Sequence, residues 1–353
     1  MLKKINSYVV KVVGDNCNLR CVYCYYESHK EKSMSLIDIE NMIKNMVEYA
    51  EYTNHPTVVI TWHGGEPLLY GLENYKKIIK IQKQHKKIKF INKVQTNGTM
   101  IDEEWIKIFK KNNFRVGVSF DGNEESHNKT RDNSYNEVIS AIKLLKKHNI
   151  QMGTLAVCSY DLLTKNPEKI IDLLIGLGVD NFDFKPYYHK ELELEKYNKA
   201  YANFIIKAFK YFLKLDDPNL NFRLLYSIID KVLGATESNL CIFNPQCGLF
   251  PSINSNGNIY RCDNYDVKNM DSYLGNILEE SLVSIMASDK YKAAEKRFNN
   301  FKKREGCQDC DVKYICNGGC PNNSDMTHNK MLFCEAYKKI FKYVEKVVNS
   351  QKR

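Results

Sequence analysis

The sequence contains no long apolar run. No stretch reaches the ~20 consecutive apolar residues of a membrane-spanning helix. The first apolar run, residues 8–13, is interrupted by Lys11 and is too short for the core of a signal peptide. Apolar residues make up 43% of the chain and neither half is depleted of them, which argues against disorder beyond the last few residues. We therefore predict a soluble protein located in the cytoplasm.

The sequence also lacks an arginine cluster, a zinc-finger pattern and an RNA-binding aromatic signature. Its net charge is +10, but the lysines are spread along the chain. In KKIIKIQKQHKKIK, residues 76–89, they are mixed with apolar residues at helical spacing, which is typical of the solvated face of a helix. A nucleic-acid partner is therefore not expected.

Strand-like and helix-like segments alternate through the first two thirds of the chain. The patterns predict strands at residues 8–13, 57–62, 91–98, 115–122, 151–159 and 181–188. They predict helices at residues 35–52, 74–85, 102–112, 135–148, 166–178, 199–215 and 335–348. Six strand–helix units indicate an α/β fold with parallel strands and crossover helices.

Residues with unusual chemistry follow the predicted strands. Cysteines follow the first strand, GGEP the second, TNG the third and DG the fourth. A TIM-type barrel collects its active site at this end of its strands, and six units instead of eight predict a partial (β/α)6 barrel with an open side. The alternation stops near Leu233, and the chain then becomes rich in loops and cysteines. We predict two domains, 1–233 and 234–353.

Eleven of the twelve cysteines lie in two regions, 17–24 and 241–334. In a cytoplasmic chain of this size they are more typical of metal ligands or catalytic groups than of a disulfide framework. Cys17, Cys21 and Cys24 form a C-x3-C-x2-C loop with no fourth cysteine nearby. On a [4Fe–4S] cluster, three thiolates leave one iron open for a substrate or cofactor.

This cysteine loop, placed after the first predicted strand, resembles that of the radical S-adenosylmethionine (radical SAM) superfamily. The resemblance implies that the open iron binds the amino and carboxylate groups of SAM. It also implies that an electron from the cluster cleaves SAM to a 5′-deoxyadenosyl radical, which takes a hydrogen from a substrate. Tyr23, the aromatic residue before the last cysteine, would pack near the adenine.

The segment GGEP consists of Gly64, Gly65, Glu66 and Pro67. It resembles the second-strand motif of the superfamily, which binds the amino group of SAM. Glycines let backbone carbonyls come close to a ligand, and Glu66 supplies negative charge beside an ammonium. The structural alternative is a Gly-Gly turn before a helix that starts at Pro67.

Three further residues are candidate SAM contacts: Asn97, Ser119 and Arg131. Ser119 matches a SAM-contacting position in related enzymes, and Asn97 is comparably placed. Each of these two could equally form a turn or a helix cap. Arg131 could bind the SAM carboxylate or could equally lie on the surface.

The C-terminal region contains eight cysteines at short intervals. They are enough for two fully ligated iron–sulfur cubanes or for two zinc sites of four thiolates each, and spacing alone does not distinguish these. The pattern C-x9-G-x4-C, then C-x2-C-x5-C-x3-C, then a final C, resembles the SPASM extension of radical SAM enzymes. That extension holds two auxiliary [4Fe–4S] clusters.

The SPASM resemblance implies two sets of four ligands. The first auxiliary cluster would be held by Cys241, Cys247, Cys262 and Cys320. The second would be held by Cys307, Cys310, Cys316 and Cys334. With the SAM-binding cluster, the chain would hold three [4Fe–4S] clusters, and the two auxiliary clusters would transfer electrons or support the structure.

Asp263 directly follows Cys262. In anaerobic sulfatase-maturating enzymes an aspartate at this place acts as the base that deprotonates the target residue. With an ordinary pKa of ~3.9, an aspartate is ionised at neutral pH, as a base must be. The alternative is a loop aspartate that accepts hydrogen bonds from local amides.

Two enzymatic functions follow from the resemblance. The protein either matures a ribosomally made peptide by forming a thioether or carbon–carbon crosslink, or oxidises Cys or Ser of a sulfatase to formylglycine. Compact length, Cys241 and Asp263 favour sulfatase maturation. His63 before GGEP, where sulfatase maturases usually carry glutamine, and Asn123, where proline is common, favour peptide maturation. We predict peptide maturation and keep sulfatase maturation as the alternative.

The expected partners are a peptide or protein substrate and a reductant such as flavodoxin or ferredoxin. The first predicted strand starts almost at once, so a leader peptide would need a separate binding protein or another surface. A zinc-stabilised, non-enzymatic binding module is the alternative of a different class. It gives no function to GGEP or to three isolated thiols.

Overall fold

The computed structural model describes residues 4–26, 31–188, 192–263, 272–301, 305–325 and 330–351. The chain divides into two compact units. The first unit consists of Met1–Ser119, Asn136–Met152 and Gly248–Lys296. The second unit consists of Phe120–Tyr135, Gly153–Cys247 and Arg297–Arg353.

The strands of the first unit follow one another in the order β10-β9-β8-β1-β2-β3-β4. They are β1 (Ser7–Val10), β2 (Thr57–Trp62), β3 (Lys89–Thr96), β4 (Arg115–Ser119), β8 (Ser252–Ile253), β9 (Asn258–Tyr260) and β10 (Tyr273–Asn276). Strands β1 to β4 pair in parallel, and β8 is parallel to β1. Strands β9 and β10 are antiparallel additions. Because parallel strands end at the same edge, the segments that follow β1, β2 and β3 come together there.

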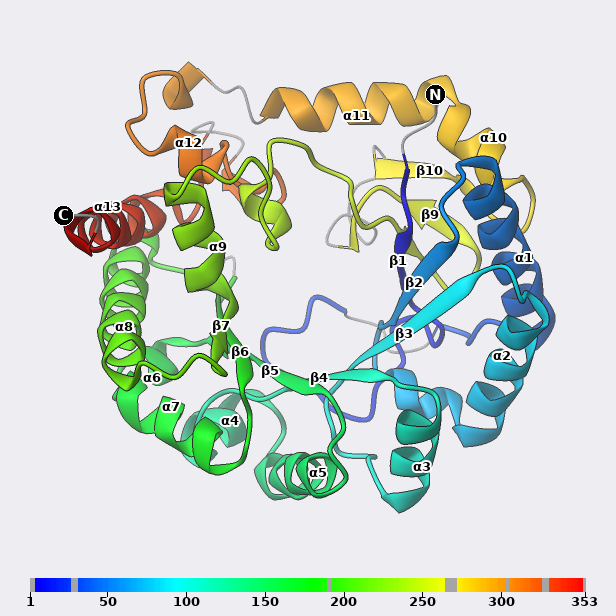
Figure 1. Ribbon diagram of the computed structural model, residues 1–353, viewed down its shortest axis with the longest axis horizontal. Helices are drawn as coiled ribbons and strands as arrows, with labels where there is room; N and C mark the ends of the chain where they lie inside the picture. The colour runs from blue at the N-terminus through cyan, green and yellow to red at the C-terminus, as the bar shows by residue number, and fades with distance from the viewer. Residues whose placement is uncertain are drawn as a thin grey trace. The chain divides into compact units, whose positions relative to one another are not determined.

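Helices α1, α2 and α3 run along the outer side of β1 to β3 (Figure 1). The helical segments that lie wholly or mostly in this unit are α1 (Leu36–Tyr52), η1 (Pro67–Tyr70), α2 (Leu72–Gln84), α3 (Glu103–Lys111), α5 (Tyr135–Lys147), α10 (Leu282–Ala287) and α11 (Asp289–Phe301). Ser35 caps α1 by accepting a hydrogen bond from the Asp38 N–H at 3.1 Å. Tyr75 of α2 packs edge-on against Trp62 and Trp105, with ring centroids 5.7 and 5.2 Å away.

In the second unit, β5 (Met152–Cys158), β6 (Asn181–Pro186) and β7 (Asn221–Phe222) are parallel. Its helices are α4 (Glu124–Thr130), α6 (Tyr160–Leu163), α7 (Pro167–Gly176), α8 (Leu194–Leu215), α9 (Arg223–Val232), α12 (Lys313–Cys316) and α13 (Cys334–Gln351). Helix α13 lies along α8 (Figure 1), where Tyr337 meets Tyr201 at 6.1 Å between ring centroids. The C-terminal helix is therefore part of the core of this unit.

The predicted α/β fold with mostly parallel strands is confirmed. Each of the six predicted strands and seven predicted helices has a counterpart in the structure. The region predicted as loop-rich also contains α10, α11 and the short strands β8 to β10. Strands of two to four residues are too short for an alternating pattern to reveal them. The domain boundary after residue 233 stays a prediction.

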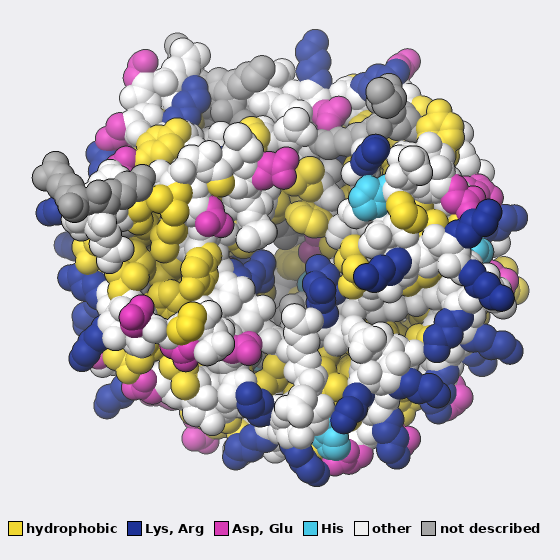
Figure 2. Space-filling model, in the orientation of Figure 1, with side chains coloured by type: hydrophobic (Ala, Val, Ile, Leu, Met, Phe, Trp, Pro, Cys, Tyr) yellow, Lys and Arg dark blue, Asp and Glu magenta, His cyan; other side chains and the backbone are white. Residues whose placement is uncertain are grey.

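The charged side chains are dispersed. Figure 2 shows lysines and arginines scattered over the visible face, with acidic and uncharged side chains between them. This agrees with the prediction that the positive charge is spread over solvated helix faces. None of the helices in the described ranges is long and apolar enough to cross a membrane.

Candidate active site

The cysteine loop follows β1 in the first unit. Cys17, Cys21 and Cys24 carry reduced thiols, and all three are half-buried. The Cys24 N–H donates to the Cys21 carbonyl oxygen at 3.0 Å, so the chain turns between the last two cysteines. Burial raises the pKa of Cys17, and the negative charges of Glu66 and Cys24 nearby raise it further. The structure thus brings the three predicted ligands together on one loop.

The GGEP segment packs directly against the cysteine loop. The Gly65 N–H donates to the Gly14 carbonyl at 2.8 Å, and the Glu66 N–H donates to the Asn16 carbonyl at 2.8 Å. A Cβ on Gly65 would lie 1.9 Å from the Asn16 oxygen, and Gly64 has a φ of +113°. No larger residue fits at either glycine without a shift of the backbone. The two glycines therefore allow the GGEP segment to pack against the cysteine loop. The sequence did not reveal this role.

Glu66 joins the end of β2 to the end of β3. Its side chain is completely buried. Oε1 accepts hydrogen bonds from the Leu68 N–H at 3.0 Å and the Thr96 hydroxyl at 2.8 Å, and Oε2 accepts one from the Asn97 N–H at 2.7 Å. Helix η1 begins at Pro67, so the predicted turn before a helix start is also present. These three hydrogen bonds of Glu66 hold the GGEP segment in position, and they do not depend on a bound ligand.

The structure also places the remaining candidates of the first unit. Asn97 is 8% exposed and directs Nδ2 toward the Cys17 sulfur, 3.8 Å away. The Ser119 hydroxyl, at the end of β4, accepts a hydrogen bond from Gln95 at 3.0 Å. Tyr23 is half-buried within the cysteine loop. Asn97 therefore lies against a predicted cluster ligand, while Ser119 contacts the neighbouring strand.

Arg131 lies in the second unit and is buried, with 8% of its surface exposed. Its Nε donates to Asp121 Oδ2 at 3.0 Å. Asp121 is itself buried and also accepts hydrogen bonds from the Thr130 hydroxyl at 2.8 Å and the Val157 N–H at 2.9 Å. The suggestion that Arg131 lies on the surface is wrong, because this carboxylate holds the guanidinium inside the unit.

Asp263 forms an ion pair with a lysine that is distant in the sequence. Lys11 Nζ lies 3.0 Å from Asp263 Oδ1, and only 1% of the lysine side chain is exposed. The same ammonium lies 5.4 and 5.1 Å from the ring centroids of Tyr25 and Tyr26, which directly follow Cys24. Asp263 is therefore held beside the C-terminal end of the cysteine loop, with 23% of its side chain exposed.

Three predicted ligands of the first auxiliary cluster come together in the second unit. Burial raises the pKa of Cys320 to about 11, and the nearby thiols of Cys241 and Cys247 contribute to this shift. Cys262, the fourth predicted ligand, belongs to the first unit. The complete set of four ligands stays a prediction.

The ligands predicted for the second auxiliary cluster lie in the second unit. Burial raises the pKa of Cys334, and Cys307 and Cys310 are close enough to add to the shift. Cys316 ends α12, next to Tyr337 of α13. In the described part of the chain, no three His, Cys, Asp or Glu side chains are arranged to hold a single metal ion.

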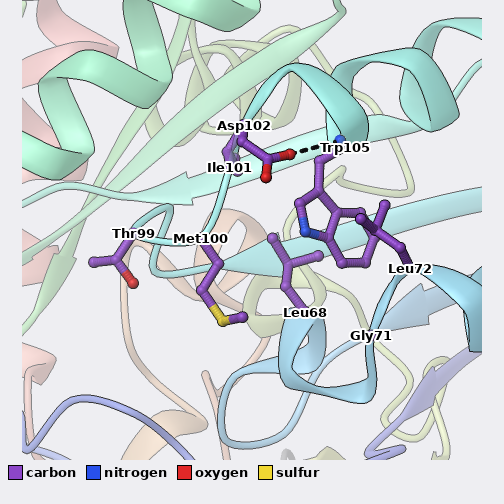
Figure 3. Close-up of a pocket in the computed structure, with 8 residues that line it drawn as sticks. All are labelled: Leu68, Gly71, Leu72, Thr99, Met100, Ile101, Asp102 and Trp105. Carbon is purple, nitrogen blue, oxygen red and sulfur yellow. Dashed lines mark hydrogen bonds between the residues drawn. The ribbon is translucent and has the colours of Figure 1, made fainter.

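A pocket of about 470 Å³ opens beside η1 and the start of α3 (Figure 3). Leu68, Met100 and Trp105 give it an apolar lining, and Asp102 caps α3 at its edge. The Thr99 hydroxyl, also in the lining, accepts a hydrogen bond from Asn18 of the cysteine loop at 2.8 Å. The pocket is thus connected to the loop through one threonine.

Comparison with known proteins agrees with this site. Residues 12–174 match the family model described as the radical SAM superfamily, and residues 241–311 match an iron–sulfur cluster-binding domain, SPASM. A cysteine-type anaerobic sulfatase-maturating enzyme of Clostridium perfringens is 30% identical over 96% of this chain and 95% of its own length. The chain belongs to the radical SAM superfamily, in the family of the anaerobic sulfatase-maturating enzymes.

Other relatives of this radical SAM enzyme have the same range of similarity. A serine-type anaerobic sulfatase-maturating enzyme of Bacteroides thetaiotaomicron is 29% identical, covering 98% of this chain and 91% of its own. A solved structure of native anSMEcpe with bound AdoMet and Cp18Cys peptide has a TM-score of 0.85 and 27% identity, over 98% of this chain and 99% of that one. The match confirms a radical SAM core followed by a SPASM domain.

Membership of the superfamily makes SAM and [4Fe–4S] clusters the cofactors of this enzyme. Two features of the structure fit them. Three reduced thiols share the loop after β1. Burial raises the pKa of Glu66 to about 7, and no cation among the described residues lowers it. A buried carboxylate without a cationic partner suits the ammonium group of SAM, which would favour its ionised form.

The comparisons also separate the predicted functions. A zinc-stabilised binding module is excluded by membership of the radical SAM superfamily. The prediction of a radical SAM enzyme that modifies a peptide or protein residue is confirmed as a class. Within that class, the relatives favour sulfatase maturation, the predicted alternative, over the preferred maturation of a ribosomal peptide.

Sequence analysis missed two contributors to the site. Lys11 was noted only as an interruption of an apolar run, although a lysine inside a strand was a signal for a buried charge. Thr96 of TNG was not considered, yet its hydroxyl is bound to Glu66. Both make their contacts with residues that are distant in the sequence: Lys11 with Asp263 and Thr96 with Glu66.

We expect Glu66→Ala to destabilise the protein by about 2–4 kcal/mol, because it leaves three buried donors without an acceptor. Urea unfolding of the metal-free protein measures this. Glu73→Ala is the matched control, because that carboxylate is 75% exposed and pairs only with Lys76 on the helix surface. This control variant should leave the urea concentration at the midpoint of unfolding unchanged from wild type. Equal midpoints for both variants would contradict the role given to Glu66.

The raised pKa of Glu66 predicts a pH dependence of stability. Folding raises this pKa from its ordinary value to about 7, so the folded state binds the proton more tightly. The resulting stabilisation is complete below the unfolded pKa and is lost as the pH rises through about 7. In the metal-free protein, Glu66→Gln should reduce the fall in unfolding free energy between about pH 5 and about pH 8. An unchanged fall would show that other groups cause it.

Proposed function

We propose that this enzyme oxidises a Cys or Ser residue of a protein substrate to formylglycine. Similarity to cysteine-type and serine-type sulfatase-maturating enzymes along at least 96% of the chain supports this function. The structural observation that carries it is the Lys11–Asp263 ion pair, which holds a carboxylate beside the cysteine loop. A base at that position is what oxidation of a hydroxyl or thiol requires.

The proposed cofactor sites use the residues described above. Cys17, Cys21 and Cys24 hold the SAM-binding cluster, and GGEP with Glu66 receives the SAM ammonium. Tyr23 packs near the adenine, and Ser119 is a further SAM contact. The eight C-terminal cysteines hold two auxiliary clusters, which gives three [4Fe–4S] clusters in all.

The oxidation removes two electrons and two protons from the target side chain. When bound at Cys17, Cys21 and Cys24, the cluster with SAM would supply the radical chemistry that removes one hydrogen atom from the target carbon, and the auxiliary clusters would supply an acceptor for the remaining electron. Asp263 takes the proton of the target hydroxyl or thiol. With serine this gives the aldehyde directly. With cysteine it gives a thioaldehyde, which water converts to the aldehyde with release of hydrogen sulfide.

Lys11 keeps Asp263 ready for this role. Its buried ammonium stabilises the negative charge of the carboxylate and fixes its position at 3.0 Å. A base that is partly exposed can meet an incoming side chain, and 23% of the Asp263 side chain is accessible. Hydrogen-bond reach between base and proton is the geometric requirement for general base catalysis.

One departure from the family pattern has a local explanation. Asn123 stands where proline is common, and its side chain caps α4 by accepting a hydrogen bond from the Ser126 N–H at 2.9 Å. This cap is a structural role that does not depend on the substrate. Asn123 therefore carries little weight in favour of peptide crosslinking.

The proposed partners are a peptide segment of the substrate protein and a reductant such as flavodoxin or ferredoxin. The related anSMEcpe binds a Cp18Cys peptide, which supports a peptide segment as the form in which the substrate is recognised. A separate leader-binding protein is not needed for sulfatase maturation.

The test is anaerobic incubation of the reconstituted enzyme with SAM, a reductant and sulfatase-derived peptides that differ only at the target position. We expect mass spectrometry to find the aldehyde with Cys or Ser at the target and no product with Ala. Each aldehyde should be accompanied by 5′-deoxyadenosine. Formation of a crosslink in place of an aldehyde would contradict sulfatase maturation and support the peptide-crosslinking alternative.

A further inference from the structure

A closed ring of hydrogen bonds connects the cysteine loop to the segment that follows β3. Asn97 Nδ2 donates to Asn18 Oδ1 at 2.9 Å, and Asn18 Nδ2 donates to the Thr99 hydroxyl oxygen at 2.8 Å. The Thr99 hydroxyl donates to Asn97 Oδ1 at 2.9 Å, which closes the ring. Neither SAM binding nor proton transfer to Asp263 accounts for this arrangement.

A backbone group fixes the direction of every bond in the ring. The Thr99 N–H lies 3.0 Å from Asn97 Oδ1. Because a backbone N–H can only donate, the atom that faces it must be the amide oxygen of Asn97. The amide NH2 group therefore points the other way, toward the cysteine loop. A flip of the amide would place two donors against each other.

The NH2 group of Asn97 has two hydrogens and two acceptors in reach. One acceptor is Asn18 Oδ1, and the other is the Cys17 sulfur at 3.8 Å. The Leu19 N–H lies 3.4 Å from the same sulfur. Asn97 is 8% exposed, so little water competes for its hydrogen bonds. The Cys17 sulfur thus faces two N–H donors, of which only Asn97 can be removed by substitution.

We propose that Asn97 donates a hydrogen bond to the Cys17 sulfur of the SAM-binding cluster and thereby raises the reduction potential of that cluster. Asn18 and Thr99 are positioning residues, which aim the Asn97 amide at the sulfur. This function differs from the SAM contact that the position of Asn97 in the sequence predicts.

The sign of the effect follows from charge. Hydrogen bonds to cluster sulfurs are one of the means by which a protein sets the potential of an iron–sulfur cluster. The reduced cluster carries one more negative charge than the oxidised cluster. A donor at the thiolate sulfur therefore stabilises the reduced form more strongly. Loss of the donor makes the cluster harder to reduce.

This inference rests on membership of the radical SAM superfamily and not on the identity of the modified residue. A peptide-crosslinking enzyme would need the same electron at the same cluster. A negative result with sulfatase-derived peptides would leave the inference intact, and an unchanged potential would leave the proposed oxidation intact.

The test is a redox titration of the reconstituted full-length protein without SAM, followed by electron paramagnetic resonance (EPR). The SAM-binding cluster is identified as the one whose signal changes when SAM is added afterwards. We expect Asn97→Ala to decrease the equilibrium constant for reduction of this cluster about tenfold, which equals ~59 mV for one electron. The auxiliary clusters should keep their potentials. A wild-type potential in Asn97→Ala, even with weaker SAM binding, overturns the proposal.

Asn97→Leu replaces Asn97→Ala if that variant does not assemble the cluster, because leucine keeps the size of the side chain and has no donor. It should show the same decrease of the equilibrium constant, and a wild-type value would overturn the proposal. A pair of variants tests the positioning role of Thr99: Thr99→Val removes the hydroxyl that bridges the two amides and Thr99→Ser keeps it. We expect a smaller decrease in Thr99→Val and the wild-type value in Thr99→Ser, and equal values would reject the Thr99 hydroxyl as a positioning group.

Discussion

We expect Cys21→Ala to abolish the formation of 5′-deoxyadenosine from SAM, to the level of protein-free controls. Cys21 is the middle one of three predicted ligands on its loop, so its loss should leave the cluster without enough ligands to remain bound. The iron content of the reconstituted protein should fall by about four atoms per chain. Liquid chromatography of the SAM reaction and iron analysis of the same preparation measure both effects.

Cys158→Ala is the matched control for this prediction. Cys158 is also a free cysteine, but it is fully buried at the end of β5 and outside the three predicted sets of ligands. This variant should keep its iron and its 5′-deoxyadenosine formation. Undiminished 5′-deoxyadenosine in Cys21→Ala would contradict the assignment of the cluster to this loop.

We expect Asp263→Asn to slow oxidation of the substrate about 100-fold, the lower end of what removal of a general base costs. Asparagine has nearly the same shape, but it cannot accept the proton from the target hydroxyl or thiol. Cleavage of SAM does not need this proton transfer, so 5′-deoxyadenosine should still form without matching product. The ratio of 5′-deoxyadenosine to aldehyde, measured in one reaction, is the informative quantity.

Two comparisons separate this effect from a structural defect. Asp289→Asn is a matched substitution at a carboxylate that is 98% exposed, and it should leave the ratio unchanged. Asp263→Asn also removes the charged partner of buried Lys11, so its unfolding midpoint should be measured alongside. If substrate oxidation and SAM cleavage decline together, or if neither declines, Asp263 is not the base.

The sequence predicted the architecture because long elements carry periodic patterns. Strand β2 and helix α1 each have an alternating or helical spacing of apolar residues that burial in the structure reproduces. Strands β8 to β10 were missed because each has at most four residues, whereas β1, also of four residues, overlaps the longer apolar run 8–13. The cysteine spacings predicted the superfamily, because they are set by the cluster that the loop must surround.

Contacts between distant segments could not be predicted. Lys11 and Asp263 are 252 positions apart, and no local pattern pairs them. The acceptance of three hydrogen bonds by Glu66 depends on where β3 ends, which only the fold determines. The same holds for Asn97, whose neighbours Asn18 and Cys17 belong to another loop.

The preference for peptide crosslinking came from two sequence positions, His63 and Asn123. In the structure, His63 is a half-buried residue at the end of β2, and Asn123 is a helix cap. Both are therefore compatible with more than one substrate. Similarity over the whole chain is the better guide here, and it favours the sulfatase-maturating enzymes.

The most direct measurement is EPR spectroscopy of the anaerobically reconstituted, reduced protein with and without SAM. We expect iron in an amount that corresponds to three cubanes. We also expect SAM to change the signal of one cluster, the one that Cys21→Ala eliminates. Protein that binds no iron, or a set of signals that SAM leaves unchanged, would contradict the claim that the loop after β1 holds a cluster with an open iron for SAM.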